Sequence, residues 1–430
     1  MKVAILTMFN GLSSTYSLVN VVAEQVQMML EANIDFTIFV SENCPDSDRS
    51  GIFLDERIQW KKIVNQLNGT QIKWYDYSKP FGKVHSTFYQ EVDVIADDLE
   101  EKLLGFDVCI MHDIHYQGWH LLHNVAIRKV QKKLTGLRFI AFTHSAPVNR
   151  PTKLEWPFSA RYTKMPNTIY VYPTQSGIPH LAKQYDISEG ICKVVNNSFD
   201  LLNFLDPSVK KIAQTVDLLS PEILVIYPAR LTTGKKFEKV ASLCGVIKTI
   251  SNKQLKLIFC DFPSSDIQPT RYKRQIIRDG MKNGMDKSDI VFTTDLGYEL
   301  GFPRKGVLDL FTVSNLFICP SYSESFGLTV LEAASRGNFI VVNEAVPALK
   351  ELGEQLKTYF LRWDARNFGF DTKETYHPTE EAYFQENASN ILQLMTEDQT
   401  LYSKTITKQH YSPNWIWKNQ LEPIIFENDN

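Results

Sequence analysis

The chain lacks closely spaced cysteines. Its six cysteines are scattered over 430 residues, and none stands in a Cys-x-x-Cys pair or in a Cys/His cluster at metal-ligand spacing. This excludes the common zinc motifs. Most of these cysteines stand in apolar, strand-like runs, where a reduced cysteine behaves as a small hydrophobic residue. A reducing cytosol is the compartment that fits this usage best.

Long hydrophobic runs are also lacking. The uncharged segment 3–23 is interrupted by polar residues and a glycine between Asn10 and Asn20, so it has no continuous apolar core. No other uncharged apolar run is long enough to span a bilayer. We therefore expect a cytoplasmic protein, and any contact with a membrane should be peripheral.

Positive and negative side chains are nearly equal in number, and the formal net charge is −3. This argues against a surface organised as a whole around nucleic acid. One local basic stretch stands out, formed by Arg128, Lys129, Lys132, Lys133 and Arg138. It would suit anionic lipid or nucleic acid, although exposed charge runs more often mark a solvated helix face.

Two domains are expected from the length of the chain, because one hydrophobic core stops growing well below 430 residues. Short apolar runs alternate with helical patterns, which indicates βαβ units and parallel sheets. The first series of expected strands is 3–9, 35–41, 107–111, 138–142 and 168–172, and the second is 222–228, 255–260, 289–293, 315–319 and 339–343.

The two series predict an N-terminal α/β domain over 1–205 and a C-terminal one over 216–410, joined by an irregular linker within 201–221. Two such domains that face each other leave a cleft at the carboxyl ends of their strands, where parallel sheets bind ligands. The fold alone does not name the ligand.

The most informative segment runs from Pro320 to Lys350. A strand ends in a Pro-Ser turn, and Glu324-Ser325-Phe326-Gly327-Leu328-Thr329 then leads into a helix that carries Glu332. Gly327 allows close approach of the backbone to a ligand. Paired carboxylates suit sugar hydroxyls, because each carboxylate accepts two charge-assisted hydrogen bonds.

This segment resembles the Glu-x7-Glu signature of retaining GT-B glycosyltransferases, the family that includes sucrose-phosphate and mannosyl transferases. The resemblance implies two Rossmann-like domains across a central cleft. It places Glu324 beside the donor sugar and Glu332 on the nucleotide ribose. The tail 411–430 is similar to the family's closing helix, which packs back onto the N-terminal domain.

A second match is Pro228–Lys236 (PARLTTGKK), which is similar to the family's Gly-Arg-Leu…Lys-Gly segment. Arg230 and Lys235 fall on the two basic positions, where cations stabilise the leaving nucleoside diphosphate without a metal. Ala229 stands where glycine is usual, and Lys236 replaces the glycine after the lysine. Which of the two lysines reaches the phosphates stays open.

Three further matches lie in the N-terminal half. Lys193–Asp200 resembles the family's Asn-Gly-Val-Asp segment at Asn197 and Asp200, and His144 resembles a strand-end histidine near the donor sugar. Gly11 lies in the loop that is usually glycine-rich after the first strand. The cluster His112, Asp113 and His115 follows another strand, and we interpret it as cleft wall and not as a metal site.

Together these matches imply a retaining transfer of a hexose from a nucleotide diphosphate-sugar, in which the phosphate accepts the proton of the acceptor. A UDP-sugar is favoured, with GDP- and ADP-sugars as alternatives; no metal and no further cofactor is required. The implied catalytic residues are His144, Glu324, Arg230 and Lys235, and the implied donor-binding residues are Gly11, Arg230, Lys235, Ser325, Phe326, Gly327, Leu328, Thr329 and Glu332.

The acceptor stays open among a glycan, a lipid, a small molecule and nucleic acid. Tyr116, Trp119 and Trp156 would suit stacking on a sugar, although aromatic residues more often belong to a core. The alternative functions are a sugar-nucleotide epimerase or a phosphorylase of the same fold, and a catalytically inert binding or assembly subunit.

Overall fold

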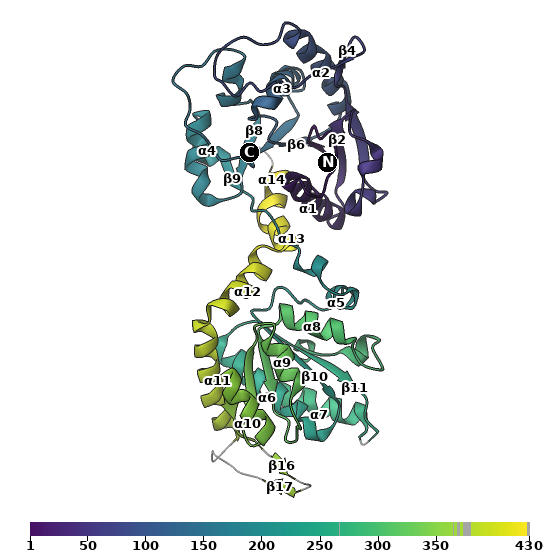
Figure 1. Ribbon diagram of the computed structural model, residues 1–430, viewed down its shortest axis with the longest axis vertical. Helices are drawn as coiled ribbons and strands as arrows, with labels where there is room; N and C mark the ends of the chain where they lie inside the picture. Colours follow the sequence, from purple (N-terminus) through teal and green to yellow (C-terminus); the bar gives the residue numbers. More distant parts are fainter. Residues whose placement is uncertain (266, 364, 368–369, 373–379, 428–430) are drawn as a thin grey trace. The chain divides into compact units, whose positions relative to one another are not determined.

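The computed structural model describes residues 1–265, 267–363, 365–367, 370–372 and 380–427 (Figure 1). The chain divides into an N-terminal unit, Met1–Phe199 with Pro413–Asn430, and a C-terminal unit, Asp200–Ser412. Within the expected domain ranges 216–410 and 411–430, positions 266, 364, 368–369, 373–379 and 428–430 lie outside the described residues.

The N-terminal unit is built on a seven-stranded sheet of order β3-β2-β1-β6-β7-β8-β9. All of its strand pairs are parallel. The strands are β1 Lys2–Leu6, β2 Asp35–Ser41, β3 Gln59–Ile63, β6 Val108–His112, β7 Arg138–Phe142, β8 Thr168–Tyr172 and β9 Cys192–Val194. Because both faces of the sheet are covered, the central strands are apolar at nearly every position.

Alternate residues of β1 belong to different cores. Ala4 and Leu6 pack with helices α2 (Phe88–Leu103), α3 (Leu121–Lys133) and α4 (Ile178–Tyr185). Val3 and Ile5 pack with α1 (Ser17–Glu31) and with the end of the chain. This alternation follows from the two-residue period of a strand and makes the unit a three-layer α/β sandwich.

The end of the chain packs on the face of the sheet that α1 also covers. It consists of α13 (Pro413–Ile416), a π-helical turn (Trp417–Leu421) and α14 (Glu422–Phe426). Its buried side chains are Ile416, Trp417, Leu421, Ile424 and Ile425. The guanidinium of Arg138, at the start of β7, donates to the carbonyl of Ile424 at 3.2 Å and also to those of Ile425 and Glu427.

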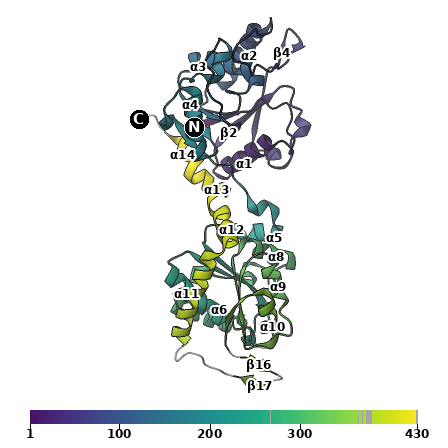
Figure 2. The same cartoon turned by 60° about the vertical axis from the view of Figure 1, so that its left-hand side comes forward.

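The C-terminal unit holds a six-stranded parallel sheet of order β12-β11-β10-β13-β14-β15. Its strands are β10 Ile223–Arg230, β11 Leu255–Phe262, β12 Ile290–Phe292, β13 Leu316–Cys319, β14 Phe339–Asn343 and β15 Tyr359–Leu361. Its helices are α5 Pro207–Ala213, α6 Phe237–Ser251, α7 Pro269–Lys282, α8 Arg304–Val313, α9 Leu328–Ala334, α10 Pro347–Leu356, α11 Glu380–Glu397 and α12 Gln399–His410. Helices α11 and α12 follow one another along one side of the unit (Figure 2).

Two short antiparallel pairs complete the described structure. They are β4 (Gln66–Leu67) with β5 (Thr70–Gln71), and β16 (Ala365–Asn367) with β17 (Phe370–Thr372). Neither pair extends one of the two large sheets.

In each large sheet the strand order reverses beside the first strand, between β1 and β6 and between β10 and β13. Loops that leave neighbouring strands in opposite directions open a crevice at such a point, and this is where doubly wound sheets bind ligands. The expected fold class is confirmed in its two doubly wound, Rossmann-like parallel-sheet domains.

The segment 201–221 differs from the expected irregular linker. It contains α5, and Val209, Ile212, Val216 and Leu218 are buried in the core of the C-terminal unit. The expectation was wrong because the apolar spacing of this short segment was too brief to be read as a helix.

We predict that Arg138→Met loosens the end of the chain. The substitution removes charge-assisted hydrogen bonds to three carbonyls, so the free energy of unfolding should fall by about 1.5–3 kcal/mol. Hydrogen exchange should become faster at residues 416–425, as mass spectrometry would show. Lys132→Met, at an exposed lysine of α3, is the matched control. Equal exchange in the two variants would contradict the anchoring role.

Candidate functional site

The strand-order reversal of the C-terminal unit brings two loops together. The loop after β10 carries Lys235 at the end of a short 3₁₀ helix (Thr233–Lys235), and the loop after β13 carries Glu324. Lys235 Nζ forms an ion pair with Glu324 Oε1, and both side chains are largely buried, at 26% and 19% exposure. The sequence separation of these two residues is 89. Two of the predicted catalytic residues therefore meet in the fold.

Backbone and buried hydroxyl groups hold the same two loops. The backbone N–H of Tyr322 donates to the carbonyl of Gly234 at 3.2 Å. The buried Tyr227 hydroxyl donates to the carbonyl of Lys235 at 2.7 Å and lies 3.3 Å from Ser321 Oγ. Burial holds the pKa of the Tyr227 phenol well above its usual value, so this hydroxyl keeps its proton.

The local backbone separates Lys235 from Lys236. A Cβ at Gly234 would lie 3.0 Å from the ring of Tyr322, which explains the close approach of the two loops there. Lys236 has a left-handed φ of 54°, and its Nζ lies 4.9 Å from the ring centroid of Tyr322. Of the two adjacent lysines, Lys235 is therefore the one that is paired with Glu324.

The second glutamate of the signature has a different partner. Gly327 adopts a φ of 95° at the start of α9, where a Cβ would come within 3.0 Å of Leu349. Glu332 lies on α9 and accepts from Arg304 Nη2 at 3.1 Å. Its side chain is 14% exposed. Each glutamate of the predicted pair is thus held by its own cation.

The remaining predicted donor-binding residues differ in how far they are exposed to solvent. Ser325, Phe326 and Leu328 are exposed, and Thr329 is half-buried. Arg230 is the last residue of β10 and is exposed. Over the described parts of the chain, its guanidinium has no hydrogen-bond or ion-pair partner. Arg230 is therefore available to an anion at the carboxyl edge of the sheet.

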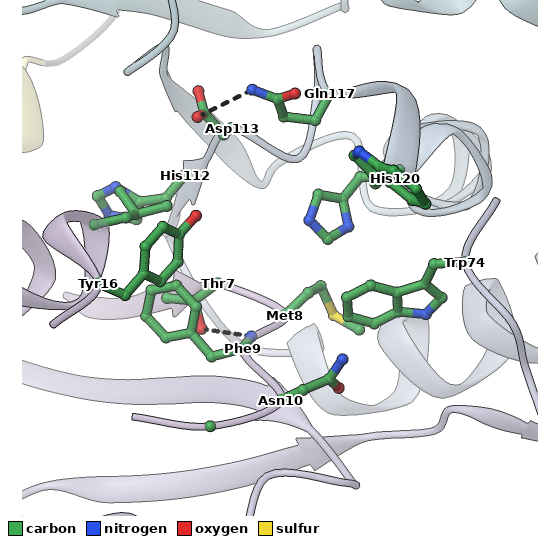
Figure 3. Close-up of a pocket in the computed structure, with 13 residues that line it drawn as sticks. Thr7, Met8, Phe9, Asn10, Tyr16, Trp74, His112, Asp113, Gln117 and His120 are labelled. Carbon is green, nitrogen blue, oxygen red and sulfur yellow. Dashed lines mark hydrogen bonds between the residues drawn. The ribbon is translucent and has the colours of Figure 1, made fainter. Parts of the chain in front are cut away.

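The N-terminal unit has a cavity of about 500 Å³ at its own strand-order reversal. Figure 3 shows aromatic, histidine and amide side chains around this space. Its lining comes from the segment after β1, the start of α1, a loop before α2 and the segment after β6: Thr7, Met8, Phe9, Asn10, Gly11, Tyr16, Leu18, Trp74, His112, Asp113, Gln117, Trp119 and His120.

Asp113 ties two loops together at this cavity. It has a φ of 57°, which is a strained conformation for a residue other than glycine. Its carboxylate accepts from the backbone N–H of His144 at 2.8 Å, from Ser145 Oγ at 3.3 Å and from Gln117 Nε2 at 3.4 Å. The loop after β7, which carries His144, is thereby fixed against the loop after β6.

His144 and His112 form a neutral pair. His112 Nδ1 and His144 Nε2 are 3.0 Å apart, so a single N–H···N hydrogen bond joins them. Burial and the neighbouring His144 hold the pKa of His112 well below its usual value. Burial also lowers the pKa of His144, although Asp113 opposes the shift. The pair can therefore donate or accept a hydrogen bond at neutral pH without carrying charge.

Gly11 lines the same cavity, as predicted for a residue of the loop after β1. A Cβ there would lie 3.0 Å from Asp48 Oδ2, so the position is tight. Tyr116 is buried, whereas Trp119 and Trp156 are exposed, and of these three only Trp119 lines the cavity.

Trp74, Tyr16, Gln117 and His120 were not singled out from the sequence, yet they line the cavity. Trp74 contacts the rings of His120 and His123, with centroids 5.0 and 5.1 Å away. Tyr16, Trp74 and Gln117 lie outside helices and strands, and His120 ends a short 3₁₀ helix (Gly118–His120), so no periodic pattern in the sequence could have found them. The nearest signal was the density of histidines between residues 112 and 123.

The segment Lys193–Asp200 matches the family at Asn197 and Asp200, and one of these two residues has a structural role. Asp200 is buried, and its carboxylate accepts from the backbone N–H of Leu202, which caps the short helix Leu201–Phe204. Asn197 is exposed. Neither residue lines the cavity of the N-terminal unit.

The basic stretch of the N-terminal unit is largely engaged within the chain. Arg128 donates to the carbonyls of Ala160, Thr163 and Lys164. Lys129 pairs with Asp93, and Lys133 pairs with Glu100. Arg138 anchors the end of the chain, and Lys132 is exposed. Lys129 and Lys133 are thus paired with acids of α2, whereas Arg128 and Arg138 donate to backbone carbonyls. A role of this stretch at an anionic membrane or nucleic acid stays a prediction.

Over the described ranges, no group of three or more His, Cys, Asp or Glu side chains is placed to hold a metal ion. Over the same ranges, no helix combines the length and the apolar character that a membrane crossing requires.

Comparison with known families matches residues 208–361 to the family described as "Glycosyl transferases group 1". The matched range contains Arg230, Lys235, Glu324 and Glu332. This match supports glycosyl transfer as the class of chemistry. No curated protein sequence matches the chain.

Three solved structures are similar at low sequence identity. A glycosyltransferase from Rickettsia africae shares 14% identity over 100% of both chains, with a TM-score of 0.35. Anabaena HepE in complex with UDP shares 14% over 99% of this chain and 100% of that chain, with a TM-score of 0.35. Sucrose-phosphate synthase from Thermosynechococcus elongatus shares 11% over 99% of both, with a TM-score of 0.37.

The buried histidines predict how stability changes with pH. Burial lowers the pKa of His115 and His120 to about 4 and that of His123 well below its usual value. Below pH about 6.5 the unfolded chain therefore binds protons that the folded chain does not. Each such histidine should lower the free energy of unfolding by about 1.4 kcal/mol per pH unit as the pH falls.

We predict that His123→Phe removes one such contribution between pH 6 and pH 5. His123 Nε2 is buried and has no hydrogen-bond partner among the described residues, and Nδ1 lies 3.2 Å from His120 Nδ1, so phenylalanine removes the imidazole together with this one contact. Chemical unfolding at the two pH values measures the slope. His180→Gln, at an exposed histidine, is the control. Identical slopes in His123→Phe and the wild type would contradict burial of a neutral imidazole.

Proposed function

We propose that this protein is a retaining glycosyltransferase that transfers a hexose from a nucleotide diphosphate-sugar, with the donor bound by the C-terminal unit. The observation that carries the proposal is the ion pair between Lys235 and Glu324. It joins the two signature segments at the strand-order reversal, inside the range that matches the glycosyltransferase family.

In this proposal the cations act on the donor's phosphates. Arg230 has an exposed guanidinium without a partner in the described part of the chain, and its planar fork suits phosphate oxygens. The ammonium of Lys235 is already held beside the site by Glu324. Negative charge that develops on the leaving diphosphate is stabilised best by cations that need no rearrangement.

The carboxylates take the donor's hydroxyl groups. Glu324 lies beside Lys235, so it is assigned to the sugar next to the diphosphate. Glu332, half-buried on α9, is assigned to the ribose hydroxyls. Arg304 holds Glu332 through one oxygen at 3.1 Å, which leaves the other oxygen for a ligand.

The N-terminal cavity is assigned to the acceptor side. Trp74 and Tyr16 offer aromatic faces, and Asn10, Gln117 and His112 offer polar groups, which together suit a hydroxyl-bearing acceptor. The neutral His112–His144 pair can hydrogen-bond a sugar hydroxyl without adding charge.

A UDP-sugar is the first donor to test, followed by GDP- and ADP-sugars. We predict that Glu332→Gln weakens donor binding, because it removes charge-assisted acceptance from the ribose. The dissociation constant for the donor should rise about ten- to hundredfold, corresponding to about 1.5–3 kcal/mol. Calorimetric titration measures it, with Glu351→Gln at an exposed acid of α10 as the matched control.

Failure of every donor to bind would contradict the proposal. Tight binding without transfer or hydrolysis would instead support an inert binding subunit. Turnover of the donor sugar without an acceptor would support an epimerase.

We also predict that Lys235→Met lowers kcat more than it weakens donor binding. The charge that Lys235 stabilises grows as the glycosidic bond breaks, and loss of one such group costs about 10²–10³ in kcat. Transfer or donor hydrolysis can be followed by release of UDP. The anomer formed, read by NMR, should keep the configuration of the donor.

The adjacent variant Lys236→Met tests the assignment of the lysine. If Lys236→Met abolished turnover while Lys235→Met retained it, the role of Lys235 would be refuted. An inverted product anomer would refute retention.

A further inference from the structure

A second cavity lies in the C-terminal unit, where helix α12 packs on the ends of α8 and α9. Its volume is about 640 Å³. It is lined by Leu201, Thr312, Val313, Arg336, Gln399, Thr400, Ser403, Lys404, Thr407 and Lys408. It shares no residue with the proposed donor site.

Three cations and four hydroxyl groups dominate this lining. The cations are Arg336, Lys404 and Lys408, and the hydroxyls belong to Thr312, Thr400, Ser403 and Thr407. Over the described residues, none of the three cations forms an ion pair with a carboxylate. No acidic side chain lines the cavity. The site therefore carries a local excess of positive charge.

Among the residues that line this cavity, Lys408 gives the strongest indication of a bound ligand. It is 3% exposed, and its Nζ has no hydrogen-bond partner among the described residues. A buried ammonium without a partner is costly, and such groups are rare in folded proteins. An anion in the cavity would give this group the partner that the protein does not supply.

Lys404 shows how a neighbouring lysine is satisfied instead. Its Nζ donates to the carbonyls of Ser314 at 2.6 Å, Arg336 at 2.8 Å and Gly337 at 3.3 Å. These carbonyls stand just beyond α8 and α9, so Lys404 caps both helix ends. One helical turn further along α12, Lys408 has no equivalent carbonyls in the described chain.

We propose that this cavity binds the phosphate group of a small phosphorylated molecule. A phosphate dianion offers three oxygens, and the residues that line the cavity include Lys408, Arg336 with its planar fork, and the hydroxyl-bearing Ser403 and Thr407. The volume exceeds what a bare phosphate fills, so the remaining space is assigned to the organic part of the ligand.

The charged groups around Lys404 and Lys408 agree with a bound phosphate. Burial and the charge of Lys404 lower the pKa of Lys408 to about 7, against the opposing influence of Asp217 and Glu222. Burial lowers the pKa of Lys404 to about 8, with Asp398 opposing the shift. The nearby acids raise the pKa of each lysine by less than burial lowers it. A bound phosphate would favour the charged form of both amines.

Calorimetric titration of the chain 1–430 tests the proposal with two probes, inorganic phosphate and glucose 6-phosphate, at constant ionic strength set with sodium chloride. Wild type should bind at least one probe. Lys408→Met should weaken binding about tenfold or more, because it removes one charge-assisted contact. Tighter binding of glucose 6-phosphate would identify an organic phosphate, and equal binding would identify free phosphate.

Two further variants keep the test decisive. Methionine resembles lysine in shape, and Arg336→Gln lies at an exposed position, so at least one of the two variants should fold. Lys282→Met, at an exposed lysine of α7, controls for the loss of one charge and should bind the probe like wild type.

Probe binding that is unchanged in both Lys408→Met and Arg336→Gln would overturn the proposal, as would no binding to wild type. Probe binding that is lost in Glu332→Gln and kept in Lys408→Met would place the phosphate at the donor site and would also overturn it. Binding of UDP-sugar should be unaffected by Lys408→Met. Failure of the donor to bind would leave this cavity's test intact, since the two tests use different probes and variants.

Discussion

The reversal of strand order beside β1 and beside β10 is the constraint on which both candidate sites depend. Parallel strands deliver their following loops to one edge of a sheet, and only at a reversal do two neighbouring loops diverge enough to leave space. In the N-terminal unit this space is the cavity that carries Gly11 and His112. In the C-terminal unit it is the meeting point of the loops after β10 and β13, where Lys235 and Glu324 pair.

The Lys235–Glu324 pair makes the C-terminal site partly preorganised. Each charge offsets the cost of holding the other in a largely buried position, since a lone buried charge is strongly unfavourable. In the proposed function, an arriving diphosphate would meet an ammonium whose position is already fixed by Glu324 and by the loop contact through Tyr227. Arg230, which has no such partner in the described structure, supplies the adaptable cation. This division between a fixed and a free cation suits a diphosphate whose negative charge increases as the glycosidic bond breaks.

Sequence patterns predicted the buried strands well, because a strand covered on both faces must be apolar, as Asp35–Ser41 and Phe339–Asn343 illustrate. The edge strand Gln59–Ile63 was missed because it is mostly polar, and Tyr359–Leu361 because it is short. At the site, the resemblance to the family's motifs singled out Lys235 and Glu324, but it could not show that the two side chains form an ion pair. Trp74 and His120 could not be predicted as cavity residues, because only the tertiary structure brings them close to the segment after β1. For the same reason the sequence could not show that Lys129 of the basic stretch pairs with Asp93 of another helix.

The two units differ in how they tolerate buried titratable groups without partners. His112 and His123 have unpartnered ring nitrogens within the described structure, but an imidazole sheds its proton close to neutral pH, so burial as a neutral ring costs little. Lys408 is also unpartnered, yet an amine must give up a proton from a usual pKa of about 10.4, which costs about 1.4 kcal/mol for each pKa unit. The N-terminal histidines are therefore stable as an uncharged cavity wall, whereas the lysine of the C-terminal cavity gains most from an anion. The same degree of burial thus implies a neutral polar ligand in one unit and a phosphate in the other.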